Sequence, residues 1–183
     1  MSPNVLTASR AYVGLGSNIA DPKRQLATAI AEMAALPDTR VAAVSSLYRT
    51  APIGGKARQP DYLNAVAAVD TLLPPRELLR SLQAIERGHR RRRTLVNGPR
   101  SLDLDLLLYG ARQRVGRELQ LPHPRLHQRA FLLLPLLEIA PEADIPGRGR
   151  ARRYLLHSRA QRVARIDASP ESINAPHRRS PVP

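Results

Sequence analysis

The chain lacks cysteine and is poor in aromatic residues. The absence of cysteine from its 183 residues excludes a disulfide scaffold, a cysteine nucleophile and a thiolate zinc site. Aromatic side chains make up only 3%, so the stacking platforms of proteins that recognise single-stranded nucleic acid are scarce. No run of about 18 apolar residues occurs, and we therefore expect no membrane span. The first residues carry no long apolar stretch, which argues against a secretory signal and fits cytoplasmic residence.

Acidic residues are also few relative to basic ones. Lysine and arginine total 29 against 15 for aspartate and glutamate, which gives a formal charge of +14. Such an excess predicts an anionic partner: a nucleotide, a nucleic acid or an acidic surface. The length favours one domain, and 43% apolar residues are enough to bury a core.

The positive charge is unevenly distributed. Residues 147–183 hold nine arginines, two acidic residues and several prolines. We therefore expect a folded domain over residues 1–146 and a basic, largely disordered extension over residues 147–183, with one helical piece at 152–166. Five of the seven residues from Arg87 to Arg93 are arginine. This segment is either a solvated loop or a clamp for an anion.

Hydrophobic periodicity predicts the order β-α-β-β-α-β followed by more helix. We expect strands at 11–15, 41–48, 62–71 and 101–109, and helices at 22–36, from 75 onward and at 126–139, the last interrupted at Pro135. This order is the split βαβ pattern of ferredoxin-like folds. The predicted fold class is α/β (α+β), a ferredoxin-like sandwich with a mainly antiparallel sheet covered by helices.

The strand at 101–109 alternates leucine with aspartate. Its leucines at 102, 104, 106 and 108 are expected on one face, and Asp103 and Asp105 on the other, with Cα atoms about 6.6 Å apart. Two carboxylates on one face repel each other, and Mg²⁺ would relieve that repulsion while also binding phosphate oxygens. Alternatively, both face solvent or pair with Arg100. Metal, arginines and a polyphosphate together indicate phosphoryl transfer.

Standard nucleotide motifs are missing. There is no G-x-x-x-x-G-K-[ST] sequence, and Gly14-Leu15-Gly16 is not completed to a dinucleotide fingerprint. We expect these two glycines to form a tight exit from the first strand. His123, between two prolines, is not sufficient for a mechanism by itself.

Five short motifs nevertheless occur together in one order. They are Gly14-Leu15-Gly16-Ser17-Asn18, Ser45-Ser46-Leu47-Tyr48-Arg49-Thr50, Gln59-Pro60-Asp61-Tyr62-Leu63-Asn64, Gly98-Pro99-Arg100-Ser101-Leu102-Asp103-Leu104-Asp105 and Leu121-Pro122-His123-Pro124. Over residues 11–146 the chain resembles 6-hydroxymethyl-7,8-dihydropterin pyrophosphokinases of folate biosynthesis. The resemblance implies a ferredoxin-like fold, two magnesium ions, and transfer of the pyrophosphoryl group of ATP to the pterin's hydroxymethyl oxygen with release of AMP.

The resemblance also implies a role for each matched residue. Asp103 and Asp105 correspond to the metal ligands, and Arg90, Arg92 and Arg100 to arginines that act on the phosphates. The implied ATP-binding residues are Gln83, Glu86, Leu106, His123 and Arg129. The implied pterin-binding residues are Thr50, Ile53, Tyr62, Asn64 and Phe131. Without the resemblance, Tyr62 is equally well explained as a packed strand residue.

Two departures and two rival functions remain. Asn97 occupies a position where many members have an aromatic residue, and the preceding loop is one residue shorter, so Arg91 and Arg93 are alternatives to Arg90 and Arg92.

The rivals are a nucleic-acid-binding protein without catalysis and an ordinary kinase that releases ADP. The extension matches no site residue, so we expect it to contribute at most nonspecific contact with nucleic acid and to leave catalysis unaffected. We expect a monomer.

Overall fold

A computed structural model of the chain describes residues 7–52, 59–89, 100–156 and 161–166. Its strands are β1 (Ser9–Ser17), β2 (Thr39–Val44), β3 (Leu47–Thr50), β4 (Tyr62–Thr71), β5 (Asp103–Tyr109), β6 (Asp144–Ile145), β7 (Gly149–Arg150) and β8 (Val163–Ile166). Its α-helices are α1 (Pro22–Ala34), α2 (Pro75–Gly88) and α3 (Ala130–Ile139), and its 3₁₀ helices are η1 (Leu126–Gln128) and η2 (Ala151–Tyr154). The predicted βαββαβ order is confirmed, except that three strands (β2, β3 and β4) lie between α1 and α2 where two were predicted.

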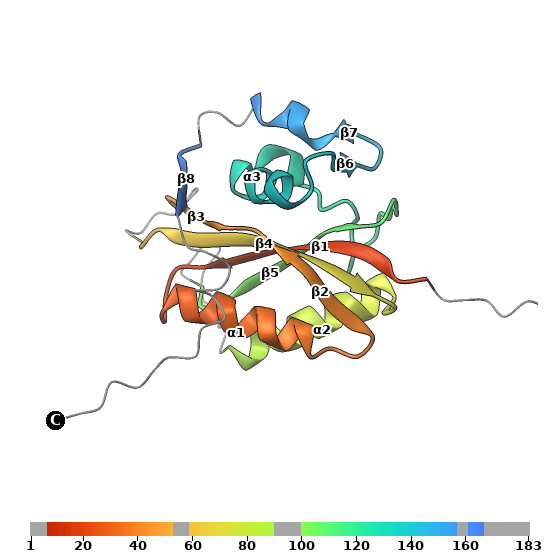
Figure 1. The fold of residues 1–183 in the computed structure, drawn as a ribbon, viewed down its shortest axis with the longest axis horizontal. Helices are drawn as coiled ribbons and strands as arrows, with labels where there is room; N and C mark the ends of the chain where they lie inside the picture. The colour runs from red at the N-terminus through yellow and green to blue at the C-terminus, as the bar shows by residue number, and fades with distance from the viewer. Residues whose placement is uncertain (1–6, 53–58, 90–99, 157–160, 167–183) are drawn as a thin grey trace, which may run out of the picture.

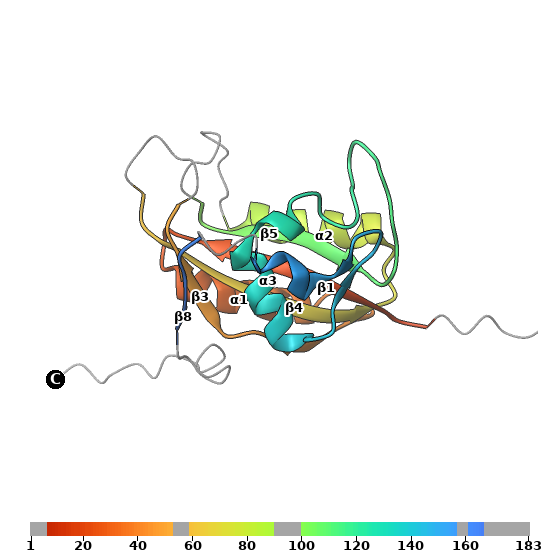
Figure 2. The same ribbon diagram turned by 90° about the horizontal axis from the view of Figure 1, so that it is seen from above.

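The main sheet is antiparallel throughout and has the order β5-β1-β4-β3-β8, with β2 also paired to β4. Helices α1 and α2 cover one face, while α3 lies on the other face together with β6, β7 and η2 (Figure 1). Seen from above, α3 lies across the middle of the sheet (Figure 2). The predicted helix-covered, mainly antiparallel sandwich is therefore confirmed.

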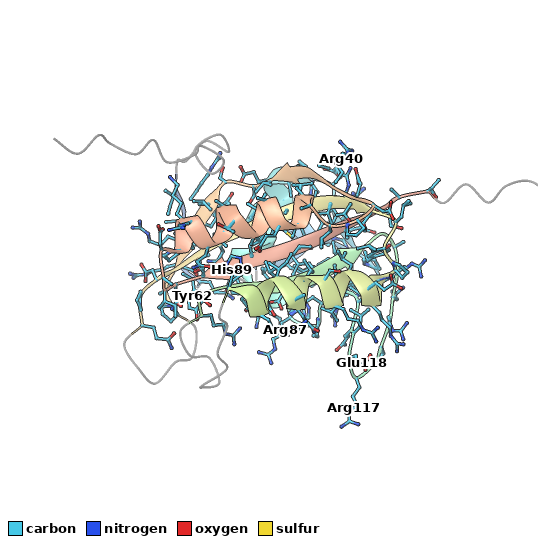
Figure 3. The ribbon with its side chains drawn as sticks, turned by 90° about the horizontal axis from the view of Figure 1, so that it is seen from below. Arg40, Tyr62, Arg87, His89, Arg117 and Glu118 are labelled. Carbon is cyan, nitrogen blue, oxygen red and sulfur yellow. The ribbon has the colours of Figure 1, made fainter. Side chains whose placement is uncertain are left out.

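Helices α1 and α2 begin where their sequences place a proline at the first turn. Asp21 caps α1 by accepting a hydrogen bond from the backbone N–H of Arg24, and Pro22 follows it directly. At the other end of α2, His89 lies beside α1, and its Nε2 is 2.8 Å from Oε2 of Glu32 (Figure 3). The two helices are thus held together near the Tyr62 end of the sheet.

Side-chain alternation divides the core into two clusters, one on each face of the sheet. Leu102, Leu104 and Leu106 pack on the side of α1 and α2, as predicted, but Leu108 packs on the side of α3 with Leu107. The predicted common face of the leucines is therefore wrong at Leu108. A shift in the pairing of β1 with β5 leaves Leu107 as an extra residue, and such a bulge reverses the alternation that follows it.

The single strand predicted for residues 41–48 is wrong, because β2 and β3 are separate strands that pair with different parts of β4. Ser45 and Ser46 separate them. The Ser45 backbone N–H donates to the Val66 carbonyl at 2.9 Å, and the Ser45 hydroxyl accepts from the Val66 N–H at 2.9 Å. These bonds satisfy the backbone of β4 where the neighbouring strand is interrupted.

The helix predicted for residues 126–139 is divided at a different point from the one expected. The break lies at Arg129, which has extended backbone angles (φ −118°, ψ 102°) between η1 and α3. Pro135 lies within α3 and does not end it. The break places Arg129 at the start of α3.

The chain beyond residue 147 continues the folded body within its described part. β7 pairs with β6, Ala151 is fully buried, and β8 pairs with β3 at the edge of the main sheet. The helix predicted for residues 152–166 is wrong: η2 ends at Tyr154, and residues 163–166 form a strand. Residue 147 is therefore not the boundary of the folded part.

A carboxylate acceptor on α3 holds β3 and β8 together. Glu138 accepts hydrogen bonds from the backbone N–H of Ser46 (3.1 Å), the Ser46 hydroxyl (2.7 Å) and the Tyr48 hydroxyl (2.8 Å). On β8, Arg165 donates to the Ser46 hydroxyl at 3.1 Å and lies 3.4 Å from the Glu138 carboxylate. One carboxylate thereby joins a helix to two strands.

None of the helices in the described ranges has both the length and the apolar character needed to cross a membrane. The longest of them, α2, has 14 residues.

We predict that Gly14→Ala lowers the free energy of unfolding by about 1–3 kcal/mol. A Cβ at Gly14 would lie 2.8 Å from Cδ2 of Leu132 on α3, a side chain that is 3% exposed. The matched control is Gly16→Ala, whose Cβ would meet nothing closer than Oδ1 of Asn64 at 3.4 Å. Equal stability of the two variants in chemical denaturation would contradict the close packing of α3 on Gly14.

We predict that Glu138 makes the protein lose stability in acid. Burial raises the pKa of Glu138, but the hydrogen bonds from Ser46 and Tyr48 outweigh burial, and the net pKa lies below the usual value. Its stabilising contribution is therefore complete above the unfolded-state pKa and is lost as the pH falls through the lower folded-state pKa. The free energy of unfolding should fall less for Glu138→Gln than for the wild type between about pH 7 and about pH 3. Parallel curves for the two proteins would refute this assignment.

Candidate active site

Two glycines of the central strand form the floor of a cavity. Gly16 pairs with Asn64 of β4 on one side and with Asp103 of β5 on the other, and Gly14 pairs with Asp105. These residues lie on the sheet face that α3 covers. The cavity has a volume of 360 Å³. It is lined by Gly14, Leu15, Gly16, Thr50, Ala51, Pro52, Tyr62, Asn64, Arg100, Asp103, Asp105, Arg125, Gln128, Arg129, Phe131, Leu132 and Gln161.

The glycines are not the strand exit that the sequence suggests. β1 continues through both of them to Ser17. Their missing side chains leave room above the strand, where α3 packs on Gly14 and the cavity opens above Gly16. The absence of a Cβ is therefore used for close approach and for space.

The acidic wall of the cavity consists of Asp103 and Asp105. Arg100 Nη1 lies 2.6 Å from Asp103 Oδ2, and Arg129 Nη1 lies 3.6 Å from Asp105 Oδ2. Burial, followed by the negative charge of Asp103, raises the pKa of Asp105 above its usual value. The two carboxylates therefore share a site that favours bound positive charge.

His123 faces the acidic wall in its neutral form. Burial, with the charges of Arg129 and Arg125, lowers the pKa of His123 to about 4. Its Nδ1 accepts a hydrogen bond from the backbone N–H of Arg125 at 3.2 Å, so the proton of the neutral ring is on Nε2. That nitrogen lies 3.7 Å from Asp105 Oδ2, and it is a neutral donor near the carboxylates.

The opposite wall is polar and aromatic. The Asn64 side-chain amide donates to the Thr50 hydroxyl at 2.9 Å and to the Tyr48 carbonyl at 3.3 Å. These bonds fix the orientation of the Asn64 amide, since both use its NH₂ group. Tyr62 pairs with Thr50 across the strands, and burial raises the pKa of its hydroxyl. A flat ligand with ring N–H groups fits such a wall.

The start of α3 closes the cavity. The guanidinium of Arg129 lies over the ring of Phe131, 5.5 Å from its centroid. Burial lowers the pKa of Arg129, which still leaves this arginine charged in the physiological range. One short segment therefore supplies both a cation for the acidic wall and an aromatic face for the opposite wall.

The structure brings together eight of the residues implied by the resemblance. Those that line the cavity are Thr50, Tyr62, Asn64, Arg100, Asp103, Asp105, Arg129 and Phe131. His123 lies beside them. Arg90, Arg92 and Ile53, together with Asn97 and the alternatives Arg91 and Arg93, lie outside the described residues.

Three other implied residues do not line this cavity. Glu86 is buried and accepts a hydrogen bond from the Leu104 backbone N–H at 2.8 Å, which ties α2 to β5. Leu106 packs in the core on the side of α1 and α2. Gln83 is a half-buried residue of α2.

Sequence reasoning did not find three polar residues of the cavity: Arg125, Gln128 and Gln161. Arg125 and Gln128 follow the Leu121–Pro124 motif closely, and this nearness was a usable signal. Gln161 lies in the extension, 31 residues beyond the start of α3 in the sequence, and only the pairing of β8 with β3 brings it to the cavity.

The acidic pair is the group best suited to a cation. Among the described residues, no group of three or more histidine, aspartate or glutamate side chains is placed to hold a metal ion together. Two carboxylates nevertheless suit Mg²⁺, which takes one or two of them when substrate phosphates and water supply the remaining ligands. The raised pKa of Asp105 fits this use, since a cation would relieve the same repulsion.

Comparison with known proteins identifies relatives of this chain. The sequence model of the 7,8-dihydro-6-hydroxymethylpterin-pyrophosphokinase (HPPK) family matches residues 12–141. A 2-amino-4-hydroxy-6-hydroxymethyldihydropteridine pyrophosphokinase of Pseudomonas aeruginosa is 47% identical over 137 residues, which cover 75% of this chain and 84% of that protein. The enzymes of the same name from Haemophilus influenzae and Bacillus subtilis are 43% and 40% identical, covering 74% and 73% of this chain and 84% and 80% of theirs.

Solved structures show the same fold in larger proteins. An HPPK-DHPS crystallised in complex with substrates superposes with a TM-score of 0.61 at 14% identity, over 82% of this chain and 43% of that one. Wild-type Plasmodium falciparum HPPK-DHPS gives a TM-score of 0.62 at 15% identity, over 84% of this chain and 42% of that one. The chain thus spans less than half the length of these two proteins. From the matched residues 12–141 and the relatives at 40–47% identity, this chain belongs to the 7,8-dihydro-6-hydroxymethylpterin-pyrophosphokinase family.

Proposed function

We propose that the chain transfers the pyrophosphoryl group of ATP to the hydroxymethyl oxygen of 6-hydroxymethyl-7,8-dihydropterin and releases AMP, a step of folate biosynthesis. The observation that carries this proposal is the single cavity in which Asp103 and Asp105 on one wall face Asn64, Tyr62 and Phe131 on the other across a glycine floor. A polyphosphate suits the first group, and a flat heterocycle suits the second.

Asp103 and Asp105 are the residues that would hold the two magnesium ions. When bound, the ions would supply charge neutralisation on the triphosphate. The carboxylates already lie beside Arg100 and Arg129. These arginines would be free to turn toward phosphate oxygens once the carboxylates have another cation, and Arg90 and Arg92 would add to the same positive field.

The opposite wall would orient the pterin. Tyr62 and Phe131 offer aromatic surfaces, and the fixed Asn64 amide presents its carbonyl oxygen toward Gly16. Holding the hydroxymethyl group between this wall and the acidic pair brings the reacting oxygen and the phosphorus together, which is the main contribution a protein makes to such a transfer. Neutral His123 would donate a hydrogen bond from its Nε2–H to a phosphate oxygen and would not act as a base.

We also propose that the protein is cytoplasmic and monomeric and that its extension contacts nucleic acid at most nonspecifically. A nucleic-acid-binding protein without catalysis is the less favoured alternative, because two carboxylates at the centre of the cavity oppose a phosphate backbone.

We predict that the protein converts ATP to AMP only when the hydroxymethyl dihydropterin and Mg²⁺ are both present. Transfer of the terminal pyrophosphoryl group leaves AMP, whereas an ordinary kinase would leave ADP. Chromatography of the nucleotides during turnover measures this directly. ADP as the sole nucleotide product would contradict the proposed reaction.

We predict that Asp103→Asn and Asp105→Asn each lower kcat/KM by about a hundredfold or more while leaving the fold intact. Both side chains face the cavity, so neither substitution leaves a hole in the core. The matched control is Asp144→Asn on β6, where the side chain is 65% exposed. Near-normal kcat/KM in either cavity variant, with kinetics measured over a magnesium titration, would show that the metal assignment is wrong.

A further inference from the structure

The extension contributes a side chain to the candidate active site. Gln161 lies 20 residues beyond the end of the family match at residue 141, yet it lines the same cavity as Arg129 and Phe131. The sequence places no site residue in this part of the chain. What Gln161 does there therefore has to be read from its contacts.

Gln161 bridges the break between η1 and α3 with both ends of its amide. Its Oε1 accepts a hydrogen bond from the backbone N–H of Ala130 at 2.9 Å, and its Nε2 donates to the carbonyl of Gln128 at 2.7 Å. These two backbone groups flank Arg129 on either side. The amide therefore holds the segment at the residue where the chain changes direction.

Helix α3 needs such a partner because it has no cap of its own. The residue in the capping position is Arg129, and its side chain makes no capping hydrogen bond. The first N–H groups of a helix have no partner within the helix. Gln161 satisfies the first of them from a distant part of the sequence.

The position of Gln161 is itself fixed from two directions. β8 pairs with β3 so that Val163 lies opposite Thr50, a residue of the same cavity. Further along β8, Arg165 is held by Ser46 and by Glu138 of α3. Gln161 is therefore placed relative to the β3 wall of the cavity and reaches from there to the start of α3.

We propose that Gln161 is a positioning residue of the pyrophosphoryl transfer: it sets where Arg129 and Phe131 stand relative to Thr50 and the acidic wall. It acts through the backbone of residues 128–130 and not by contact with the reacting atoms. This proposal rests on the proposed function, because Phe131 and Arg129 matter to catalysis only if pterin and ATP occupy the cavity. It replaces the expectation that the extension leaves catalysis unaffected.

The test compares Gln161→Leu, Gln161→Glu and the control Gln113→Leu in the full chain. Leucine is similar in size to glutamine but can make neither of the two hydrogen bonds. Glutamate keeps the acceptor for Ala130 N–H, with a charge that suits a helix N-terminus, but loses the donor to Gln128. Gln113 is exposed and does not line the cavity, so its replacement by leucine makes the same chemical change elsewhere.

We expect Gln161→Leu to lower kcat/KM for the pterin about tenfold, mainly through a higher KM, because two hydrogen bonds that locate Phe131 are lost. Gln161→Glu should recover part of that loss, and Gln113→Leu should behave as the wild type. Melting temperatures are measured beside the kinetics, and all assays run far below them. The partial rescue in KM is the readout that a loss of stability alone would not give.

Two results would overturn the proposal. The first is wild-type KM and kcat in Gln161→Leu. The second is a kinetic loss that follows melting temperature alone and is the same in the leucine and glutamate variants. A wild-type chain that forms no AMP from ATP and the pterin would instead overturn the proposed function, so the two failures are distinguishable.

Discussion

The site depends on a central strand that has no side chains at two positions. Gly14 and Gly16 lie between β4 and β5 on the face that α3 covers. At Gly14 the missing Cβ lets Leu132 approach, and at Gly16 it leaves the space that separates Asn64 from Asp103. Helix packing and ligand space are therefore set by two positions of one strand. A side chain at Gly14 would push against α3, and a side chain at Gly16 would fill part of the cavity.

The two carboxylates of the cavity are neutralised by arginines before any ligand arrives. Asp103 and Asp105 are set against Arg100 and Arg129, with neutral His123 beside them. Each arginine is within reach of a carboxylate that would otherwise repel a triphosphate. A bound cation would compete for those carboxylates and release positive charge toward the phosphates. Two of the chain's arginines are thus used to neutralise the acidic pair until a cation binds.

Much of this arrangement could be predicted from the sequence, because it depends on short patterns of neighbouring residues. The alternation of Asp103 and Asp105 with leucines predicts the acidic face, and the matched motifs predict the two walls. The bulge at Leu107 and the interruption at Ser45 and Ser46 were missed, since both depend on pairing with another strand. Gln161 was missed for the same reason: its role arises from the register of β8 on β3, which composition does not reveal in an arginine-rich segment.

Stability and site geometry are joined in this fold through α3. Its first turn carries Arg129 and Phe131, its middle packs on Gly14 through Leu132, and its last turn carries Glu138. Glu138 fixes β3 and β8. Gln161, which lies just before β8, in turn supports the first turn of α3. The contacts therefore form a closed loop from one end of the helix to the other. A change that loosens β8 acts at both ends at once, because the strand that Glu138 holds is the strand that positions the start of α3.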